Sequence, residues 1–386
     1  SVDEAGNVEA GPPGVRLPAV TTGVNLGLPP EAASSTSATP NATAPAQGQT
    51  NPLFTQAAAQ VSAGPNANRA SGFTTVYEPF AAHTLAGELL GSGAGIGPLG
   101  IAFSLDGAKV YFSGGPGRNQ LYRFVSGVDA PTLIATLDLP IYDMVTDHGG
   151  RLWATTGGGP LVELDPDTGA IIRSIGEGFE LGLAVAPSGD LFVSTRDGIA
   201  RVRPTDGLVI PFSHTRVDGL AVAPDGTVWG TTWPSQGELM RFDASGRPSR
   251  VADLPGELEG LAFGQPGTPL EGLLFLSAAT GGQLLALDLA TLHSTPLAIG
   301  GSRGDFIHVS PDGKLYVTQS DRITVVQAAT APRVVSAVPV VGSITNPAVI
   351  SARLVFDQEM SADSVQAAGS VANTANYRLV NAVTSP

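Results

Sequence analysis

A sequence frame that recurs about every 40 residues is the strongest constraint on the fold of this chain. The segment "GLAVAPDGTVWGTT" (219–232) aligns with "GLAVAPSGDLFVST" (182–195), "DMVTDHGGRLWATT" (143–156) and "GIAFSLDGAKVYFSG" (100–114). The frame returns in "GLAFGQPG" (260–267) and "FIHVSPDGKLYVTQ" (306–319), so successive copies lie 37 to 46 residues apart. A period of this length indicates a solenoid, a propeller or another repeat array.

Strand and turn signals inside each repeat select among these architectures. In the clearest repeat, residues 219–224 are apolar, as expected of a strand that is packed on both faces. Asp225-Gly226 predicts a tight hairpin, because glycine tolerates a positive φ. Further short strands are predicted at 227–232, 238–244 and 249–255. Four antiparallel strands per repeat predict an all-β protein built on a six-bladed β-propeller.

The last repeat has only three strand signals, the third at 323–327. An orphan segment before the first repeat, "HTLAGELLG" (83–91), is predicted to supply the fourth strand and so to close the ring. Closure in this way would leave no open sheet edge. A seventh blade assembled from residues 71–92 is the alternative. The propeller is therefore expected to span residues 71–330.

Residues 1–70 are predicted to be an extended, low-complexity linker. Alanine, serine, threonine, proline, glycine and asparagine dominate residues 11–70, a composition that buries little surface. Asn51 as a helix cap, Pro52 at the first helical position and Gly64 as a stop signal predict a short helix near 52–62. Whether a partner holds this segment is left open by the sequence.

Charge and composition exclude several kinds of partner and site. The chain has 34 acidic and 20 basic residues, a net charge of −14, and only Lys109 and Lys314 as lysines. Such a chain is repelled by phosphate, so we expect no nucleic-acid partner. No cysteine is present, which rules out disulfides and cysteine nucleophiles. No apolar run of about 18 residues occurs, so direct membrane insertion is not expected.

Five carboxylates are predicted to lie near the propeller axis. Asp218, Glu259 and Asp305 precede the innermost strand of three consecutive repeats, and Asp143 and Glu180 lie within one residue of that position. Side chains there would converge on the central channel. Oxygen ligands of this kind suit Ca²⁺ or Mg²⁺, which are the only cofactors that the sequence suggests. The alternative is that each carboxylate accepts backbone N–H groups where a strand begins, or faces water.

The remaining candidate residues have simpler interpretations. Among the histidines, His214 is the one that could act as a base near Asp218, whereas His308 is interpreted as a core histidine of an innermost strand. Trp233 lies outside the repeated aromatic position and is a candidate for surface contacts. The segment "DPDTG" (165–169) lacks the downstream glutamate of a calcium loop, and is predicted to be a type I turn.

Two propeller families resemble these repeats. "GPLGIAFSLDGAKVYFSG" and "VDGLAVAPDGTVWGTTW" are similar to repeats of the gluconolactonase and senescence-marker-protein family of six-bladed, metal-dependent lactonases. That resemblance implies Asp218 as a metal ligand, but Leu99 and Leu181 occupy the places of the family's asparagine ligand. Leu152-Trp153 and Val228-Trp229 resemble the repeats of virginiamycin B lyase-like and NHL-type propellers. The lyase family uses a histidine base near a metal.

Residues 331–386 resemble the beginning of a bacterial Ig-like domain of cell-surface and S-layer proteins. The resemblance rests on Val334-Val335-Ser336, Leu354-Val355-Phe356 with Met360, and Asn376-Tyr377-Arg378-Leu379. It implies a partial β-sandwich, because the match covers about half the length of a sandwich domain. The chain also begins without methionine, and Asp3 to Asn7 read like the closing turn of a preceding domain. We therefore expect a piece of a longer exported bacterial protein, extracellular or at the cell surface.

These observations favour a noncatalytic propeller that serves as a rigid platform for assembly or ligand contact. Its expected partners are other domains or subunits of a surface assembly. A metal-dependent lactonase-like hydrolase or lyase that uses the acidic channel mouth is the first alternative. An adhesin head that binds a glycan or a protein is the second alternative.

Overall fold

A computed structural model describes the repeats of the chain almost continuously and the two ends of the chain only in short pieces. The described residues are 24–26, 49–63, 72–91, 96–126, 130–232, 237–251, 254, 257–278, 282–302, 306–328, 334–338, 353–356 and 379–381. The chain divides into two compact units, one formed by residues 42–329 and the other by residues 1–41 together with 330–386.

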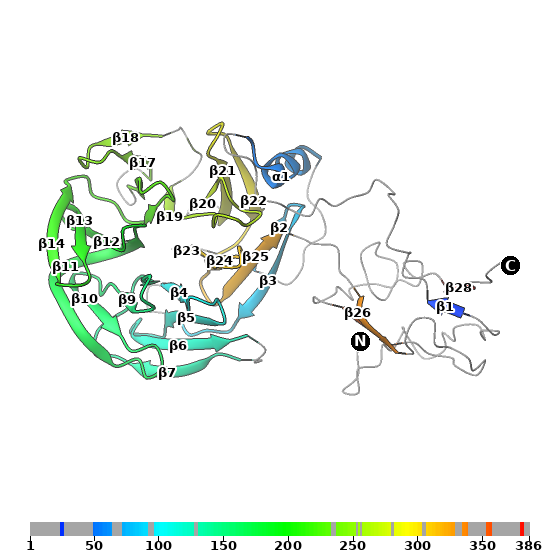
Figure 1. Ribbon diagram of the computed structural model, residues 1–386, viewed down its shortest axis with the longest axis horizontal. Helices are drawn as coiled ribbons and strands as arrows, with labels where there is room; N and C mark the ends of the chain where they lie inside the picture. Colours follow the sequence, from blue (N-terminus) through cyan, green and yellow to red (C-terminus); the bar gives the residue numbers. More distant parts are fainter. Residues whose placement is uncertain are drawn as a thin grey trace. The chain divides into compact units, whose positions relative to one another are not determined.

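The larger unit is built from antiparallel sheets arranged around a centre (Figure 1). Two of these sheets have four strands each, which follow one another in chain order from the centre outward. The strands of two four-stranded sheets are β4 (Ile101–Phe103), β5 (Lys109–Gly114), β6 (Gln120–Val125) and β7 (Thr132–Thr136), and β15 (Leu220–Val222), β16 (Val228–Thr231), β17 (Leu239–Phe242) and β18 (Pro248–Arg250). The all-β prediction is confirmed, and the repeat frame coincides with the first hairpin of each of these sheets.

Two repeats share one seven-stranded sheet because a single strand passes through both. This strand, β11 (Ile171–Val185), pairs with β10 through its first half and with β12 through its second half. Its register shifts between Phe179 and Leu183, where the chain moves from one repeat to the next. The other strands are β8 (Met144–Thr146), β9 (Leu152–Ala154), β10 (Gly159–Leu164), β12 (Leu191–Thr195), β13 (Gly198–Arg203) and β14 (Leu208–Ser213).

The two last repeats each recruit a strand from the N-terminal side of the chain. β2 (Thr75–Val76) joins the outer edge of one sheet, and β3 (Phe80–Ala86) joins the outer edge of the next. The remaining strands are β19 (Leu258–Phe263), β20 (Leu273–Ala278), β21 (Gln283–Asp288) and β22 (Ser294–Ile299), and β23 (Ile307–Val309), β24 (Leu315–Thr318) and β25 (Ile323–Ala328).

Strand β3 closes the ring, but it lies earlier in the chain than the predicted segment 83–91. Phe80 pairs with Ala328 and Ala86 with Ile323, so the ladder covers the whole of β25. Phe80 and Ala86 are buried, whereas Leu90 is 65% exposed, and this difference explains the shift toward the N-terminus. Innermost strands contact one another in the order β4, β8, β11, β15, β19, β23 and back to β4.

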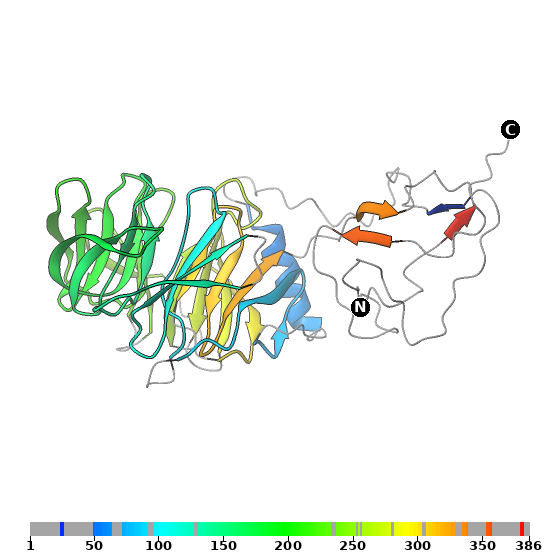
Figure 2. The same cartoon turned by 90° about the horizontal axis from the view of Figure 1, so that it is seen from below.

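Inner strands approach closely because four of the six repeats have glycine at the first position of the frame, namely Gly100, Gly182, Gly219 and Gly260. A Cβ on Gly182 would lie 2.4 Å from the carbonyl oxygen of Asp218, and a Cβ on Gly219 would lie 2.4 Å from that of Glu259. Any side chain at these two positions would therefore push neighbouring sheets apart. Between the sheets, alternate strand residues form buried apolar clusters, which fill the space seen edge-on in Figure 2.

Helix α1 (Pro52–Ala63) packs on the outside of the β19–β22 sheet. Leu53, Phe54 and Ala57 are buried in the same cluster as Leu297 and Ala298 of β22. The helix predicted near 52–62 is therefore present and is held by the β19–β22 sheet. No helix among the described residues has the length and apolar character needed to span a membrane.

Asn51 fixes the first turn of α1 to the ring. Its side-chain oxygen accepts a hydrogen bond from the Leu53 N–H at 2.8 Å, as an N-cap does. Its side-chain nitrogen donates to the carbonyl oxygens of Pro269 (2.9 Å) and Glu271 (2.8 Å). The Asn51 backbone N–H donates to Asp288 Oδ2 at 2.9 Å.

In the smaller unit, four strands are described. β1 (Val24–Leu26) pairs with β28 (Leu379–Asn381), and β26 (Val334–Val338) pairs with β27 (Arg353–Phe356). The strands expected around Val334 and Leu354 are thus present. Most of residues 331–386 lies outside the described residues, so the Ig-like assignment stays a prediction.

Candidate functional site

In two inner strands, one residue differs from the residue that the repeat frame predicts. The fold brings these two residues into contact. Asp143 stands where other repeats have Gly100, Gly182 or Gly219, and His308 stands where they have alanine or valine. Asp143 directly precedes β8 and His308 is the middle residue of β23. The two residues are 165 positions apart, yet His308 Nε2 lies 2.9 Å from Asp143 Oδ1.

The carboxylate of Asp143 is fixed by backbone groups before it meets the histidine. Oδ1 accepts the Met144 N–H at 2.8 Å, and Oδ2 accepts the Leu183 N–H of β11 at 2.9 Å. The Asp143 N–H itself donates to the hydroxyl of Thr155 at 3.0 Å. With a side chain only 3% exposed, this carboxylate has one well-defined position.

The strand between the two residues makes room for their contact. β4 contacts both β8 and β23, and its repeat begins at Gly100. A Cβ on Gly100 would lie 2.8 Å from the Asp143 main chain. The glycine therefore allows Asp143 to lie against β4, within reach of a histidine from the sheet on the other side.

This arrangement orients the imidazole of His308 for proton transfer. When Nε2–H donates to the carboxylate, Nδ1 carries the lone pair that accepts a proton. Among the described residues none forms a hydrogen bond with Nδ1, and the His308 side chain is 18% exposed. Tyr316 pairs with His308 across the sheet, and burial raises the pKa of Tyr316 to about 12, so this neighbour remains neutral.

The five predicted carboxylates do not gather into one described metal site. Asp143 is engaged as described above, and Glu180 Oε2 forms an ion pair with Arg216 at 3.0 Å. Glu259 is the second residue of β19 rather than the residue before it, because Leu258 already pairs with Ala278. Asp218 precedes β15 by two residues, and Asp305 lies outside the described residues.

The described residues therefore do not fit a divalent cation. Within the described ranges no three histidine, aspartate or glutamate side chains are grouped as metal ligands would be. We derive no chemical step through a metal. The complete five-carboxylate set, which includes Asp305, stays a prediction.

Sequence reasoning treated His308 as a packing residue and favoured His214, which is exposed on the loop after β14. Compared with the other repeats, His308 and Asp143 break the repeat frame of their inner strands. That departure was the available signal for both His308 and Asp143. Trp233, the surface-contact candidate, lies outside the described residues.

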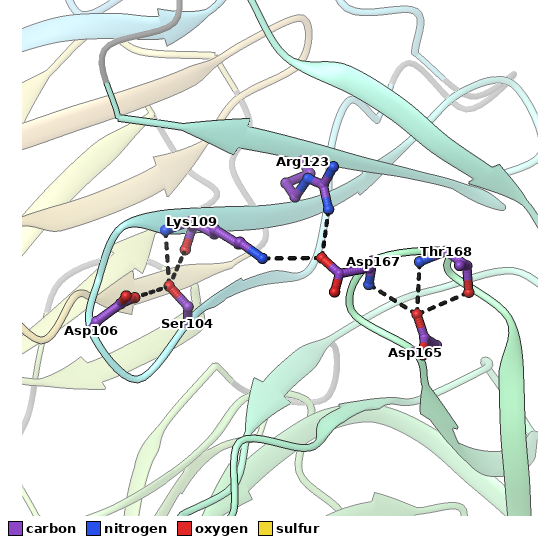
Figure 3. Close-up of polar contacts among 7 residues, drawn as sticks. All are labelled: Ser104, Asp106, Lys109, Arg123, Asp165, Asp167 and Thr168. Carbon is purple, nitrogen blue, oxygen red and sulfur yellow. Dashed lines mark hydrogen bonds and ion pairs between the residues drawn. The ribbon is translucent and has the colours of Figure 1, made fainter.

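The "DPDTG" segment forms a turn that joins two sheets, as Figure 3 shows. Asp165 Oδ1 accepts the N–H groups of Asp167 (3.0 Å) and Thr168 (2.7 Å), and the Thr168 contact holds the pKa of Asp165 below its usual range. Asp167 Oδ1 meets Lys109 Nζ at 3.0 Å and Arg123 Nη1 at 2.9 Å. The two cations come from β5 and β6, so the predicted turn ties the β4–β7 sheet to its neighbour.

Comparisons with known proteins reveal similarity in structure alone. No family model matches the chain, and none of the curated proteins matches it. A gluconolactonase from Xanthomonas campestris is 17% identical with a TM-score of 0.53, covering 68% of this chain and 96% of its own. The soluble aldose sugar dehydrogenase of Escherichia coli is 15% identical with a TM-score of 0.50, covering 64% and 99%.

The fold is a β-propeller. A streptogramin B lyase is also similar, at 14% identity and a TM-score of 0.47 over 64% of this chain and 97% of its own. Gluconolactonases are one of the propeller groups that the repeats resemble. At identities this low, the comparisons establish the architecture of the propeller and leave its chemistry to the residues described above.

Proposed function

We propose that the propeller is an enzyme in which His308, oriented by Asp143, acts as a general base on a small molecule that enters the ring. The observation that carries the proposal is the 2.9 Å contact between His308 Nε2 and a carboxylate already fixed by two backbone N–H groups. A histidine oriented in this way is the proton-transfer half of many hydrolytic sites. We further propose that the ring has six blades, one for each copy of the repeat frame.

The reaction that we propose is the hydrolysis of a lactone, in line with the gluconolactonase among the similar structures. His308 Nδ1 takes a proton from a water molecule as the water oxygen attacks the lactone carbonyl. The ring C–O bond then breaks, and the proton on Nδ1 passes to the departing alkoxide oxygen. Water is added, the product is a hydroxy acid, and the imidazole returns to its starting state.

A set of three single variants tests this proposal by hydrolysis of sugar lactones, followed through the acid that is released. His308→Ala removes the base and should lower kcat/KM by about 100-fold or more. Asp143→Asn should also lower kcat/KM, because the imidazole of His308 loses the negative charge that orients it. His214→Ala is the matched control and should leave the rate unchanged. Hydrolysis that survives in His308→Ala, or no hydrolysis of any lactone by the unchanged protein, would refute the proposal.

The second candidate function is a noncatalytic platform, and a specific observation favours it. The chain carries a second compact unit in addition to the propeller, as a module of a multidomain protein would. In this proposal His308 and Asp143 only hold inner strands together, and the partners are other domains or subunits of a surface assembly. The Ig-like assignment of 331–386 and the extracellular or cell-surface location belong to the same proposal.

A further inference from the structure

The outer rim of the propeller carries an apolar edge strand that nothing described covers. In β14, Leu208, Val209 and Ile210 are 43%, 38% and 43% exposed, and Pro211 is exposed as well. β14 is the last strand of its seven-stranded sheet and pairs only with β13 among the described strands, as Figure 1 shows at the rim. Edge strands are normally protected by charged side chains or by proline; residues 207–213 contain no charged residue, and Pro211 leaves residues 208–210 of the edge without either protection.

The neighbouring outer strand also exposes apolar residues. A Cβ on Gly176 of β11 would lie 3.6 Å from a methyl group of Val209, so β11 and β14 lie against each other here. Ile171 and Ile172, at the beginning of β11, are 41% and 57% exposed. We call Ile171, Ile172 and residues 208–211 the rim patch. Exposed apolar residues on outer strands of this kind are candidates for a contact site.

Another outer edge strand of the same propeller, β22, is covered by further parts of the chain. β22 takes up β2 as an additional strand, with Thr75 opposite Ile299 and Val76 opposite Ala298. Helix α1 covers the apolar residues beside it. In the described part of the chain, β14 receives neither of these protections.

We propose that the rim patch is an interface between two copies of this chain, in which β14 of one copy pairs antiparallel with β14 of the other. Antiparallel pairing of a strand with itself about a twofold axis is self-complementary, and here it places apolar residues opposite apolar residues. The two cationic residues nearest in β13 are neutralised locally, Arg201 by Asp190 and Arg203 by Asp206. In a chain of net charge −14, an uncharged rim is where a second copy meets least repulsion.

The first experiment measures the mass of the full chain in solution by light scattering after gel filtration, across a range of protein concentrations. We expect the unchanged protein to move from 39.1 kDa toward twice that mass as its concentration rises. Ile210→Lys should remain monomeric at every concentration, because it places like charges across the pair. Leu105→Lys is the matched control, since Leu105 is 57% exposed outside the patch, and it should dimerise normally.

A second experiment works even if the lysine variant folds poorly. The chain has no cysteine, so a single Val209→Cys substitution provides one thiol near the proposed axis. Mild oxidation should join two such chains through a disulfide much faster than it joins chains carrying Leu105→Cys. A chain that stays monomeric at all concentrations, an Ile210→Lys variant that dimerises like the unchanged protein, or equal cross-linking of both cysteine variants would overturn the proposal.

Discussion

Replacing Asn51 tests whether helix α1 is an integral part of the propeller. Asn51→Ala removes the N-cap bond to Leu53, which is worth about 1 kcal/mol. It also leaves the part-buried carbonyl oxygens of Pro269 and Glu271 without their donor, at about 1 kcal/mol each. We therefore expect the free energy of unfolding to fall by about 3 kcal/mol.

Asn51→Ser separates these contributions. Serine can still cap the helix but cannot donate to both carbonyl groups, so this variant should lose about 2 kcal/mol. Urea unfolding, followed by the fluorescence of the buried Trp153 and Trp229, measures both variants against the unchanged protein. A loss below about 0.5 kcal/mol in Asn51→Ala would refute the reasoning. It would mean that the ring is equally stable without the anchored helix.

Two further predictions concern a hairpin and a buried carboxylate. Gly226 has φ = +84° and open space around its missing Cβ. Gly226→Val should therefore lower the free energy of unfolding by about 1–3 kcal/mol through the backbone alone, and Gly226→Asn by clearly less. Equal losses of the two variants in urea unfolding would show that φ is not the cause. Burial opposes ionisation of Asp147, but hydrogen bonds, beginning with that from Trp153 Nε1, outweigh it and hold the pKa of Asp147 below its usual value. Its contribution to stability is therefore present above about pH 4 and is lost as the pH falls through the folded-state pKa. Between pH 6 and 2, the midpoint temperature of thermal unfolding should fall more steeply for the unchanged protein than for Asp147→Asn. The exposed Asp138→Asn is the control. Parallel curves for the unchanged protein and Asp147→Asn would contradict the assignment.

The sequence predicted those features that depend on short-range patterns. The repeat frame located the inner hairpins, and the Asp225-Gly226 turn has the positive φ that was expected of Gly226. The closing strand was placed a few residues too late, because "HTLAGELLG" alone does not reveal that Phe80 is buried beside β25. Local apolar pattern identifies a strand better than it identifies the ends of the strand.

Contacts across long stretches of chain could not be predicted in this way. Asn51 meets Asp288 over 237 positions, and Asp143 meets His308 over 165. Each contact requires distant segments to fold together first, and only then do the two hydrogen-bonding groups face each other. The sequence also did not reveal that Glu180 pairs with Arg216, and the five-carboxylate cluster, which includes Asp305, stays a prediction.

The β3–β25 ladder also determines how the ring would respond to mechanical tension. Phe80, where β3 begins, is opposite Ala328, where β25 ends, so the chain enters and leaves this ladder at the same end. A pull on the two flanking segments would unzip the pairs one after another, beginning at Phe80, and would not shear them all at once. On the N-terminal side, α1 and β2 precede the ladder and are held on β22, so they would bear the force first. The innermost strands would remain unstrained until the ladder had opened.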